Sequence, residues 1–129
     1  MNTDKRRLEL DELTEKIIGC VFAVSNTLGC GFLEKVYENT LAQEFRKRDI
    51  QFSQQHPIQI RYDSVIVGDY VADFLVEENV LVELKVVKDL DDVHVAQCLN
   101  YLKATGISVC LLLNFGKPKV TVKRVVQDF

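Results

Sequence analysis

Residues 69–85 read Asp69-Tyr-Val-Ala-Asp73-Phe-Leu-Val-Glu-Glu-Asn-Val-Leu-Val-Glu83-Leu-Lys85. Two runs rich in valine, leucine and aromatic residues flank Glu-Glu-Asn at 77–79, a pattern typical of two antiparallel strands joined by a short loop. With the turn centred on residue 78, Asp73 lies opposite Glu83, and Lys85 lies opposite Val71. Alternation then predicts that Asp73, Glu83 and Lys85 share one face of the hairpin.

The neighbours of these charged residues distinguish two interpretations. The same alternation places Val71, Leu75 and Leu81 on the charged face, and the other face is expected to be apolar, with Ala72, Phe74, Val82 and Leu84. Opposed carboxylates repel, and Mg²⁺ would offset the repulsion, since it binds through one or two carboxylates. The alternative is a solvated face with Lys85 paired to an acid. A charged cluster among apolar neighbours is usually paired or metal-bound, so both interpretations stay open.

Composition bounds the class of protein. The chain has 129 residues, 47% of them hydrophobic and a net charge of −3, which fits one domain over 8–129 behind a flexible tail over 1–7. No signal-peptide pattern or membrane-spanning run is evident, so we expect a cytoplasmic protein without a membrane partner. The cysteines lack metal-ligand spacing and are expected to be buried free thiols: Cys20, Cys30, Cys98 and Cys110.

The remaining elements follow from periodicity and turn residues. Helices are predicted over 8–28, with apolar spacing and a stop at Gly29, and over 33–48, with a stripe formed by Leu33, Val36, Tyr37, Leu41 and Phe45. A third helix begins at Asp91 or Asp92 and ends at Gly106. Residues 108–115 form a buried strand and residues 120–126 an edge strand. The order is ααβββαββ, an α/β sandwich around one mixed sheet.

Several polar residues lie beside apolar helix faces. Glu34 opens the second helix, where an acid is also expected simply because it complements the helix dipole. Gln97 and Tyr101 are four residues apart on the third helix, so their side chains meet; a surface glutamine packed on a tyrosine explains the pair equally well. His94 lies one turn earlier and is expected to be a hydrogen-bonded residue near the helix start.

Taken together, these residues resemble a known family. Gly31-Phe-Leu-Glu34-Lys-Val-Tyr37 matches the signature of the GxxExxY proteins, a compact branch of the PD-(D/E)XK nuclease superfamily. Further matches follow in order over roughly 10–126. They are Gln55-His-Pro-Ile58, Val67-Gly-Asp-Tyr-Val-Ala-Asp73-Phe, Val82-Glu83-Leu-Lys85, the segment from His94 to Gly106, and Leu111-Leu-Leu-Asn-Phe-Gly116.

The resemblance implies a fold and residue roles. The fold is a restriction-endonuclease-like αβββαβ core with a mixed central sheet flanked by helices, an extra N-terminal helix and a C-terminal edge strand. The site residues are the metal ligands Asp73, Glu83 and Glu34, the catalytic Lys85, and the substrate-binding Gln97 and Tyr101. Ala72 stands where the superfamily name has proline, a departure that leaves the carboxylate chemistry intact.

The expected function is metal-dependent hydrolysis of phosphodiester bonds, with Mg²⁺ or Mn²⁺ as cofactor and nucleic acid as substrate, DNA ahead of RNA. The alternative is a non-catalytic module that binds nucleic acid or protein and keeps the nuclease scaffold; the negative net charge and small size favour it. A small-molecule enzyme has no motif in support, because no nucleotide-cofactor loop is present. Endo or exo cleavage, substrate structure and oligomeric state stay open.

Overall fold

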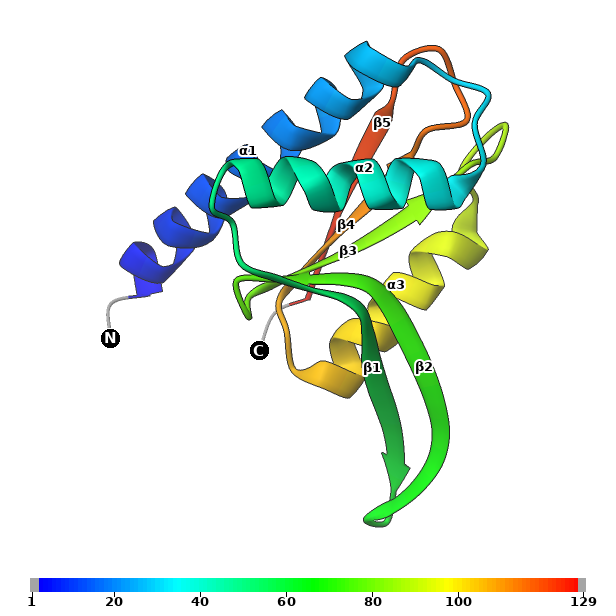
Figure 1. Ribbon diagram of the computed structural model, residues 1–129. Helices are drawn as coiled ribbons and strands as arrows, with labels where there is room; N and C mark the ends of the chain where they lie inside the picture. The colour runs from blue at the N-terminus through cyan, green and yellow to red at the C-terminus, as the bar shows by residue number, and fades with distance from the viewer. Residues whose placement is uncertain (1–2, 128–129) are drawn as a thin grey trace.

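The computed structural model describes residues 3–127 and contains the eight predicted elements in the predicted order (Figure 1). They are α1 (Thr3–Leu28), α2 (Glu34–Lys47), β1 (Phe52–Tyr62), β2 (Val65–Val76), β3 (Val80–Lys85), α3 (Asp92–Thr105), β4 (Val109–Asn114) and β5 (Thr121–Val126). Asp91 caps α3 through its side chain, and Gly106 ends it in the left-handed conformation, as predicted.

The strands form one mixed sheet in the order β1-β2-β3-β4-β5. The β3–β4 pair is parallel, with α3 as the crossover, and the other pairs are antiparallel. Helices α1 and α2 cover one face and α3 covers the other, which gives three layers (Figure 1). This α/β arrangement is consistent with the restriction-endonuclease-like fold expected from the sequence.

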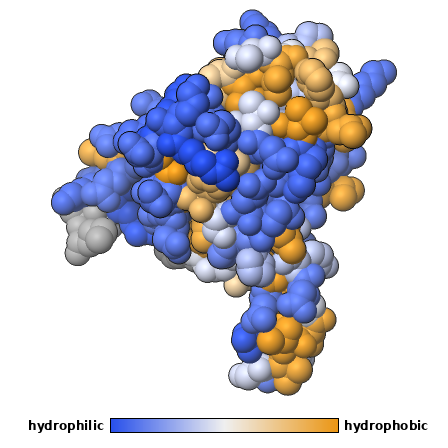
Figure 2. Space-filling view, viewed as in Figure 1, coloured by the Kyte–Doolittle hydropathy of each residue, from blue (hydrophilic) through white to orange (hydrophobic). Residues whose placement is uncertain are grey.

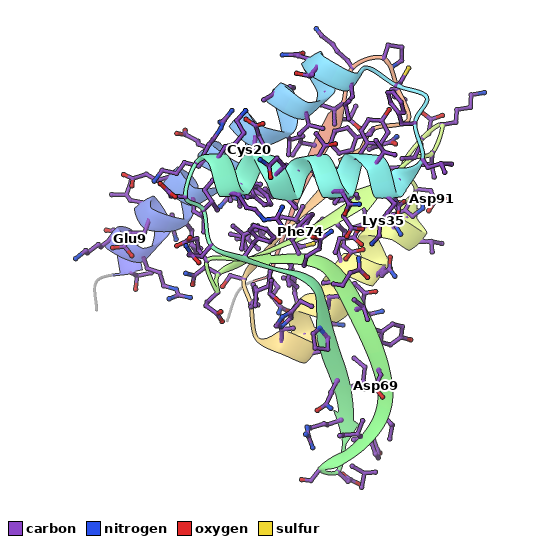
Figure 3. All side chains as sticks on the ribbon, viewed as in Figure 1. Glu9, Cys20, Lys35, Asp69, Phe74 and Asp91 are labelled. Carbon is purple, nitrogen blue, oxygen red and sulfur yellow. The ribbon has the colours of Figure 1, made fainter. Side chains whose placement is uncertain are left out.

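Each face of the sheet has its own core. The larger core packs α1 and α2 against one face of the sheet, and Figure 3 shows Phe74 in the layer beneath α2. The smaller core packs α3 against the other face and contains Leu75, Leu81 and Tyr101. Since β3 and β4 are buried on both faces, they carry the near-continuous apolar runs seen in the sequence.

The predicted hairpin register is confirmed where the ladder exists, because Phe74 pairs with Val82 and Leu75 with Leu81. The prediction for Ala72 is wrong: it packs on the α3 side with Leu75 and Leu81, whereas Phe74 packs on the α1/α2 side. Regular alternation breaks at Asp73, where the β2–β3 ladder stops and β1 has an irregularity.

That irregularity is Gln55, whose φ of 53° is in the left-handed region. Its neighbours pair normally, Gln54 with Phe74 and His56 with Ala72. Val71 consequently leaves the predicted charged face and is exposed. The β1–β2 register is the same on both sides of Gln55, so the break in the ladder is confined to the position opposite the first acidic site residue.

Beyond Ala72, β1 and β2 leave the sheet as a long twisted hairpin, which we call the arm (residues 56–72) (Figure 1). Asp63 and Ser64 form its tip, both with positive φ, as two-residue hairpin turns require. The arm carries exposed apolar side chains at Tyr62, Val65 and Val67, and Figure 2 shows hydrophobic surface on this projection.

Other expectations need correction. Helix α1 begins at Thr3, so residues 3–7 of the expected tail form its exposed first turns, while residues 1 and 2 lie outside the described part. Leu33 and Val36 are exposed, since α2 begins only at Glu34 and its buried stripe starts at Tyr37. Cys30 is also exposed, whereas the other three free thiols are buried. No helix within residues 3–127 is both long and apolar enough to cross a membrane.

Candidate metal and nuclease site

Asp73 and Glu83 lie across from each other where β2 and β3 diverge. The backbone N–H of Asp73 donates to Glu83 Oε1 at 2.8 Å, and the N–H of Leu84 donates to Asp73 Oδ2 at 2.8 Å. Each carboxylate therefore replaces a backbone acceptor on the opposite strand. These two bonds fix both carboxylates between the strands, next to each other as the sequence predicts.

The pair is electrostatically unfavourable without a cation. Burial, followed by the charge of Asp73, raises the pKa of Glu83 to about 8. Burial also raises the pKa of Asp73, although the N–H of Leu84 opposes the shift. A carboxyl group held near neutral pKa by burial and a like charge is typical of functional sites.

Two further charged residues lie near the carboxylate pair: Lys85 on β3 and Glu34 on α2. Lys85 ends β3 half-buried, and its positive charge lowers the pKa of Asp73, Glu83 and Glu34. Glu34 lies at the first residue of α2; partial burial raises its pKa, and the charge of Asp73 adds to the rise. The structure thus brings all four predicted residues into one electrostatic cluster.

The start of α2 is held by Tyr37. Its hydroxyl donates to the Gly29 carbonyl at 2.8 Å and accepts from the Phe32 N–H at 3.2 Å. Its ring stacks on Phe115 with the centroids 4.7 Å apart. Gly31 has a φ of 111°, a backbone conformation that residues other than glycine rarely adopt. The glycine and the tyrosine of the motif therefore shape the loop that positions Glu34.

Two site residues escaped the sequence analysis. Glu38 is only 3% exposed, and its carboxylate accepts from Gln54 at 2.6 Å and from Gln55 at 3.0 Å. Gln55 also donates to Asp73 Oδ1 at 3.3 Å, which links Glu38 to the carboxylate pair. Helical spacing from Leu41 was the available signal, because it places Glu38 on the buried face of α2.

Helix α3 supplies the predicted glutamine and tyrosine. Gln97 Nε2 donates to the Tyr101 hydroxyl at 2.9 Å, so the expected contact is confirmed. Burial, with Glu83 next, raises the pKa of Tyr101 to about 12. Since the bond from Gln97 occupies a lone pair, the hydroxyl proton of Tyr101 stays available for donation. His94 caps the helix, accepting from the N–H of Asp91 at 3.1 Å.

Asn114 secures the chain immediately after Lys85. It pairs with Lys85 in the parallel ladder, and its side chain is fully buried. Its Oδ1 accepts from the N–H groups of Val87 and Gly116, and its Nδ2 donates to the Val87 carbonyl at 2.9 Å. Three hydrogen bonds thus orient the end of β3 that carries the lysine.

Within residues 3–127, no set of three or more His, Cys, Asp or Glu side chains is gathered closely enough to hold a metal ion. The donor chemistry nevertheless fits a hard divalent cation, because Mg²⁺ commonly takes only one or two carboxylates and fills its shell with water and phosphate oxygens. Asp73 and Glu83 each accept a backbone hydrogen bond through one oxygen. Their raised pKa values show that the ionised pair is unfavourable in this position, and a bound cation would stabilise it.

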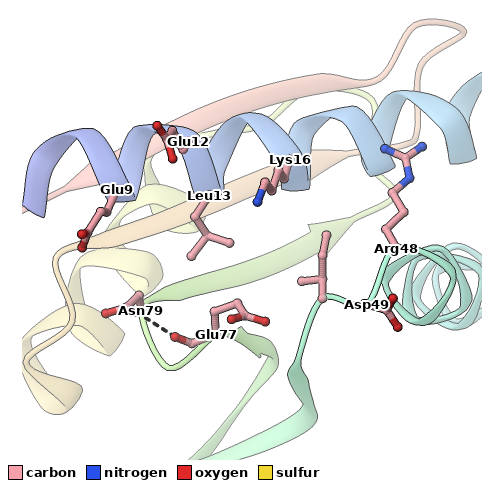
Figure 4. A pocket seen from close by; sticks show the side chains of 9 residues that line it. Glu9, Glu12, Leu13, Lys16, Arg48, Asp49, Glu77 and Asn79 are labelled. Carbon is pink, nitrogen blue, oxygen red and sulfur yellow. Dashed lines mark hydrogen bonds between the residues drawn. The ribbon is translucent and has the colours of Figure 1, made fainter.

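A separate pocket lies between α1 and the β2–β3 turn (Figure 4). Glu9, Glu12 and Lys16 contribute from α1, Arg48 follows α2, and Glu77 lies in the turn. It contains none of the residues described above. Its mixed charges and exposed carboxylates give it no catalytic arrangement, so the site at the divergence of β2 and β3 is the candidate.

Known structures share this architecture. One is an alkaline exonuclease from Laribacter hongkongensis (LHK-Exo), with a TM-score of 0.52 at 14% identity over 67% of this chain and 52% of that chain. Another is SSO0001, with a TM-score of 0.58 at 15% identity over 96% of this chain and 62% of that chain. The chain therefore spans less than two thirds of either protein.

At these identities the similarity shows a shared fold. No curated protein matches the sequence significantly. The model of the PD-(D/E)XK nuclease superfamily matches residues 11–125, nearly the whole chain and all the site residues described above. PD-(D/E)XK nucleases generally use divalent metals. The chain belongs to the PD-(D/E)XK nuclease superfamily.

Proposed function

We propose that the protein is a metal-dependent nuclease of the GxxExxY branch that hydrolyses phosphodiester bonds in nucleic acid. The proposal depends mainly on the pair formed by half-buried Asp73 and buried Glu83, whose carboxyl groups each reach across to the opposite strand near Lys85. Keeping two neighbouring carboxyl groups partly out of water raises their pKa values and costs stability, which is expected where a cation is to be bound.

Asp73 and Glu83 would hold Mg²⁺ or Mn²⁺, with Glu34 as a further oxygen donor. The ion would supply positive charge beside the phosphodiester and acidify the attacking water. Glu34 extends from a different element than the strand carboxylates, so its contribution depends on the loop that Tyr37 holds.

Lys85 would stabilise the negative charge that develops on the phosphate oxygens. It is half-buried beside three carboxylates, where a fixed charge acts more strongly than in water. Tyr101 would donate its hydroxyl proton to a phosphate oxygen, with Gln97 holding that hydroxyl in place. Both residues lie on α3, and Tyr101 is near enough to the strand carboxylates that the charge of Glu83, second to burial, raises its pKa.

DNA ahead of RNA as substrate, the absence of a nucleotide cofactor, and a cytoplasmic location remain predictions from the sequence. A second candidate function is a non-catalytic module on the same scaffold. One observation favours it: each strand carboxylate already accepts a backbone hydrogen bond, and within residues 3–127 no third His, Cys, Asp or Glu lies close enough to form a metal-binding set with them.

Cleavage assays on single-stranded, duplex and branched DNA and RNA distinguish these functions. The wild type should cut at least one substrate in Mg²⁺ or Mn²⁺, and Lys85→Ala should lower the rate by about 100- to 1000-fold. Lys88→Ala is the matched control, since this lysine is exposed in the loop after β3. Equal rates for the wild type and Lys85→Ala would indicate a contaminating nuclease, and binding without cleavage would favour the module.

A further inference from the structure

A groove of about 920 Å³ runs between the arm and α3 and reaches Lys85 at the candidate site. Gln59, Ile60, Arg61 and Tyr70 line it from the arm. The α3 wall spans nearly the whole helix, from Val93 to Ala104. One continuous surface therefore joins the part of the arm formed by residues 59–61 and Tyr70 to the proposed catalytic lysine.

The groove is cationic although the chain is acidic. Arg61, Lys85 and Lys103 line it, with His94 at the start of α3, and none of its lining residues within the described chain is acidic. The net charge of the whole protein is −3. A local positive surface leading into a site that would handle a phosphodiester favours a polyanion as the occupant.

The groove is also lined by aromatic and apolar side chains. Tyr70 is 51% exposed, and its ring lies 5.8 Å from that of buried Tyr101, with a 52° angle between the planes. Ile60 and Ala104 line the same groove. An exposed ring supported by a buried ring is a platform on which a planar base can stack.

We propose that this groove binds a single polynucleotide strand, with Arg61 and Lys103 on its phosphates and Tyr70 stacking against a base, and leads it to Lys85. The proposal rests on the proposed nuclease function and adds the substrate class and the residues that hold it. Cations alternating with an aromatic platform suit single strands of DNA or RNA, since both expose bases and phosphates.

A single strand fits better than a duplex for two reasons. Paired bases are stacked on each other, so the face of Tyr70 would have no base to contact. The reactive end is recessed, because Glu83 and Tyr101 are both about 4% exposed. A flexible strand can enter between the arm and α3, whereas a duplex presents its phosphates on a wide, rigid surface.

The test is fluorescence anisotropy with labelled oligothymidylate, oligouridylate and a matched duplex, each of about 15 nucleotides, in EDTA to prevent cleavage. The variants are Arg61→Gln/Lys103→Gln and Tyr70→Ala. Lys123→Gln is the charge control, being exposed on β5 at the opposite edge of the sheet. Tyr70→Phe is the ring control, and circular dichroism checks the fold of each variant.

We expect single strands to bind more tightly than the duplex. The double variant should flatten the dependence of log K on log salt by about 1.4, and Tyr70→Ala should weaken binding by roughly 5- to 150-fold. Lys123→Gln should match the wild type, and Tyr70→Phe, which keeps the ring, should restore most of the binding that Tyr70→Ala loses. The two single-stranded probes report whether the sugar matters.

Two outcomes would overturn the groove proposal alone: cleavage by the wild type with unchanged binding in the groove variants, or tighter binding of the duplex. Loss of single-strand binding in the groove variants, in a wild type that binds but never cleaves in Mg²⁺ or Mn²⁺, would keep the groove and refute the nuclease. A wild type that neither binds nor cleaves would refute both.

Discussion

Two carboxylates, Asp73 and Glu83, take the place of the backbone hydrogen bonds that would otherwise continue the β2–β3 ladder. Each accepts from the opposite strand, so the site is built into the point where the sheet opens. The same arrangement withdraws two neighbouring carboxyl groups from water, which raises the pKa of each. The arrangement that we propose for metal binding therefore lowers the stability of the metal-free protein.

The first prediction concerns Glu83→Gln and pH. Between the ordinary pKa of 4.5 and the folded value of about 8, the folded protein holds a proton on Glu83 that the unfolded chain has lost. The free energy of unfolding should therefore fall as pH rises through this range. Glutamine keeps the acceptor for the Asp73 N–H and does not titrate, so the fall should be shallower in the variant.

Urea unfolding across this pH range measures the effect. Glu78→Gln is the control, since Glu78 is exposed in the β2–β3 turn and should leave the slope as in the wild type. Parallel stability curves for the wild type and Glu83→Gln would show that Glu83 does not titrate in this range.

The second prediction is metal linkage. A divalent ion that binds only the folded protein should raise its stability by about 2.7 kcal/mol at roughly 100 times the dissociation constant, which is several degrees in Tm. Asp73→Asn should remove the shift while keeping an acceptor for the Leu84 N–H. Thermal melts with and without millimolar Mn²⁺ test this, and a wild-type Tm unchanged by Mn²⁺ would contradict it.

Among the elements, the start of α2 depends on one buried hydroxyl. Tyr37→Phe removes both hydrogen bonds to the 29–32 loop but keeps the stack on Phe115. We expect a loss of about 1–3 kcal/mol in unfolding free energy, because two hydrogen bonds are removed and each contributes about 0.5–1.5 kcal/mol. The proposed cleavage rate should also fall, since Glu34 follows this loop.

Chemical denaturation and cleavage rates measure the two effects separately. Tyr62→Phe is the matched control: Tyr62 is 71% exposed at the end of the arm, so its stability should not change. A Tyr37→Phe variant as stable as the wild type would mean that water replaces the hydroxyl.

The hairpin shows what the sequence could and could not predict. Turn residues and apolar alternation were enough to predict the pairing of Phe74 with Val82. Alternation failed at Ala72, because it assumes an unbroken ladder and Asp73 interrupts it. Glu38 was missed because its partners, Gln54 and Gln55, come from a distant strand. Local patterns therefore predicted the elements, but not the polar contacts between them.

In the whole molecule, the three-layer body and the arm have separate tasks. The body contains the larger core, most of the smaller core and the carboxylate pair. The arm adds Ile58 and Ala72 to the smaller core at its base, and it carries exposed residues towards its tip and one wall of the cationic groove. The net charge averages over the molecule, whereas a polyanion responds to the local charge of the surface that it meets.

The last prediction separates these tasks by shortening the arm. Ile60 and Gly68 are paired across the hairpin, so replacing residues 61–67 with Asn-Gly should close it with a two-residue turn. The removed side chains are exposed, so the Tm should change little. The Mn²⁺-dependent rise in Tm should persist, since the carboxylate pair lies in the body.

Cleavage of single strands should fall, because Arg61, which would contact the phosphates, is removed with the tip of the arm. Hydrolysis of a small diester such as bis(p-nitrophenyl) phosphate should stay near the wild-type rate, since it needs only the site. Lys85→Ala, assayed in parallel, should lose both activities. If shortening the arm abolished the small-diester reaction while the Tm and its response to Mn²⁺ were unchanged, the arm would belong to the catalytic site itself and the division of tasks would be wrong.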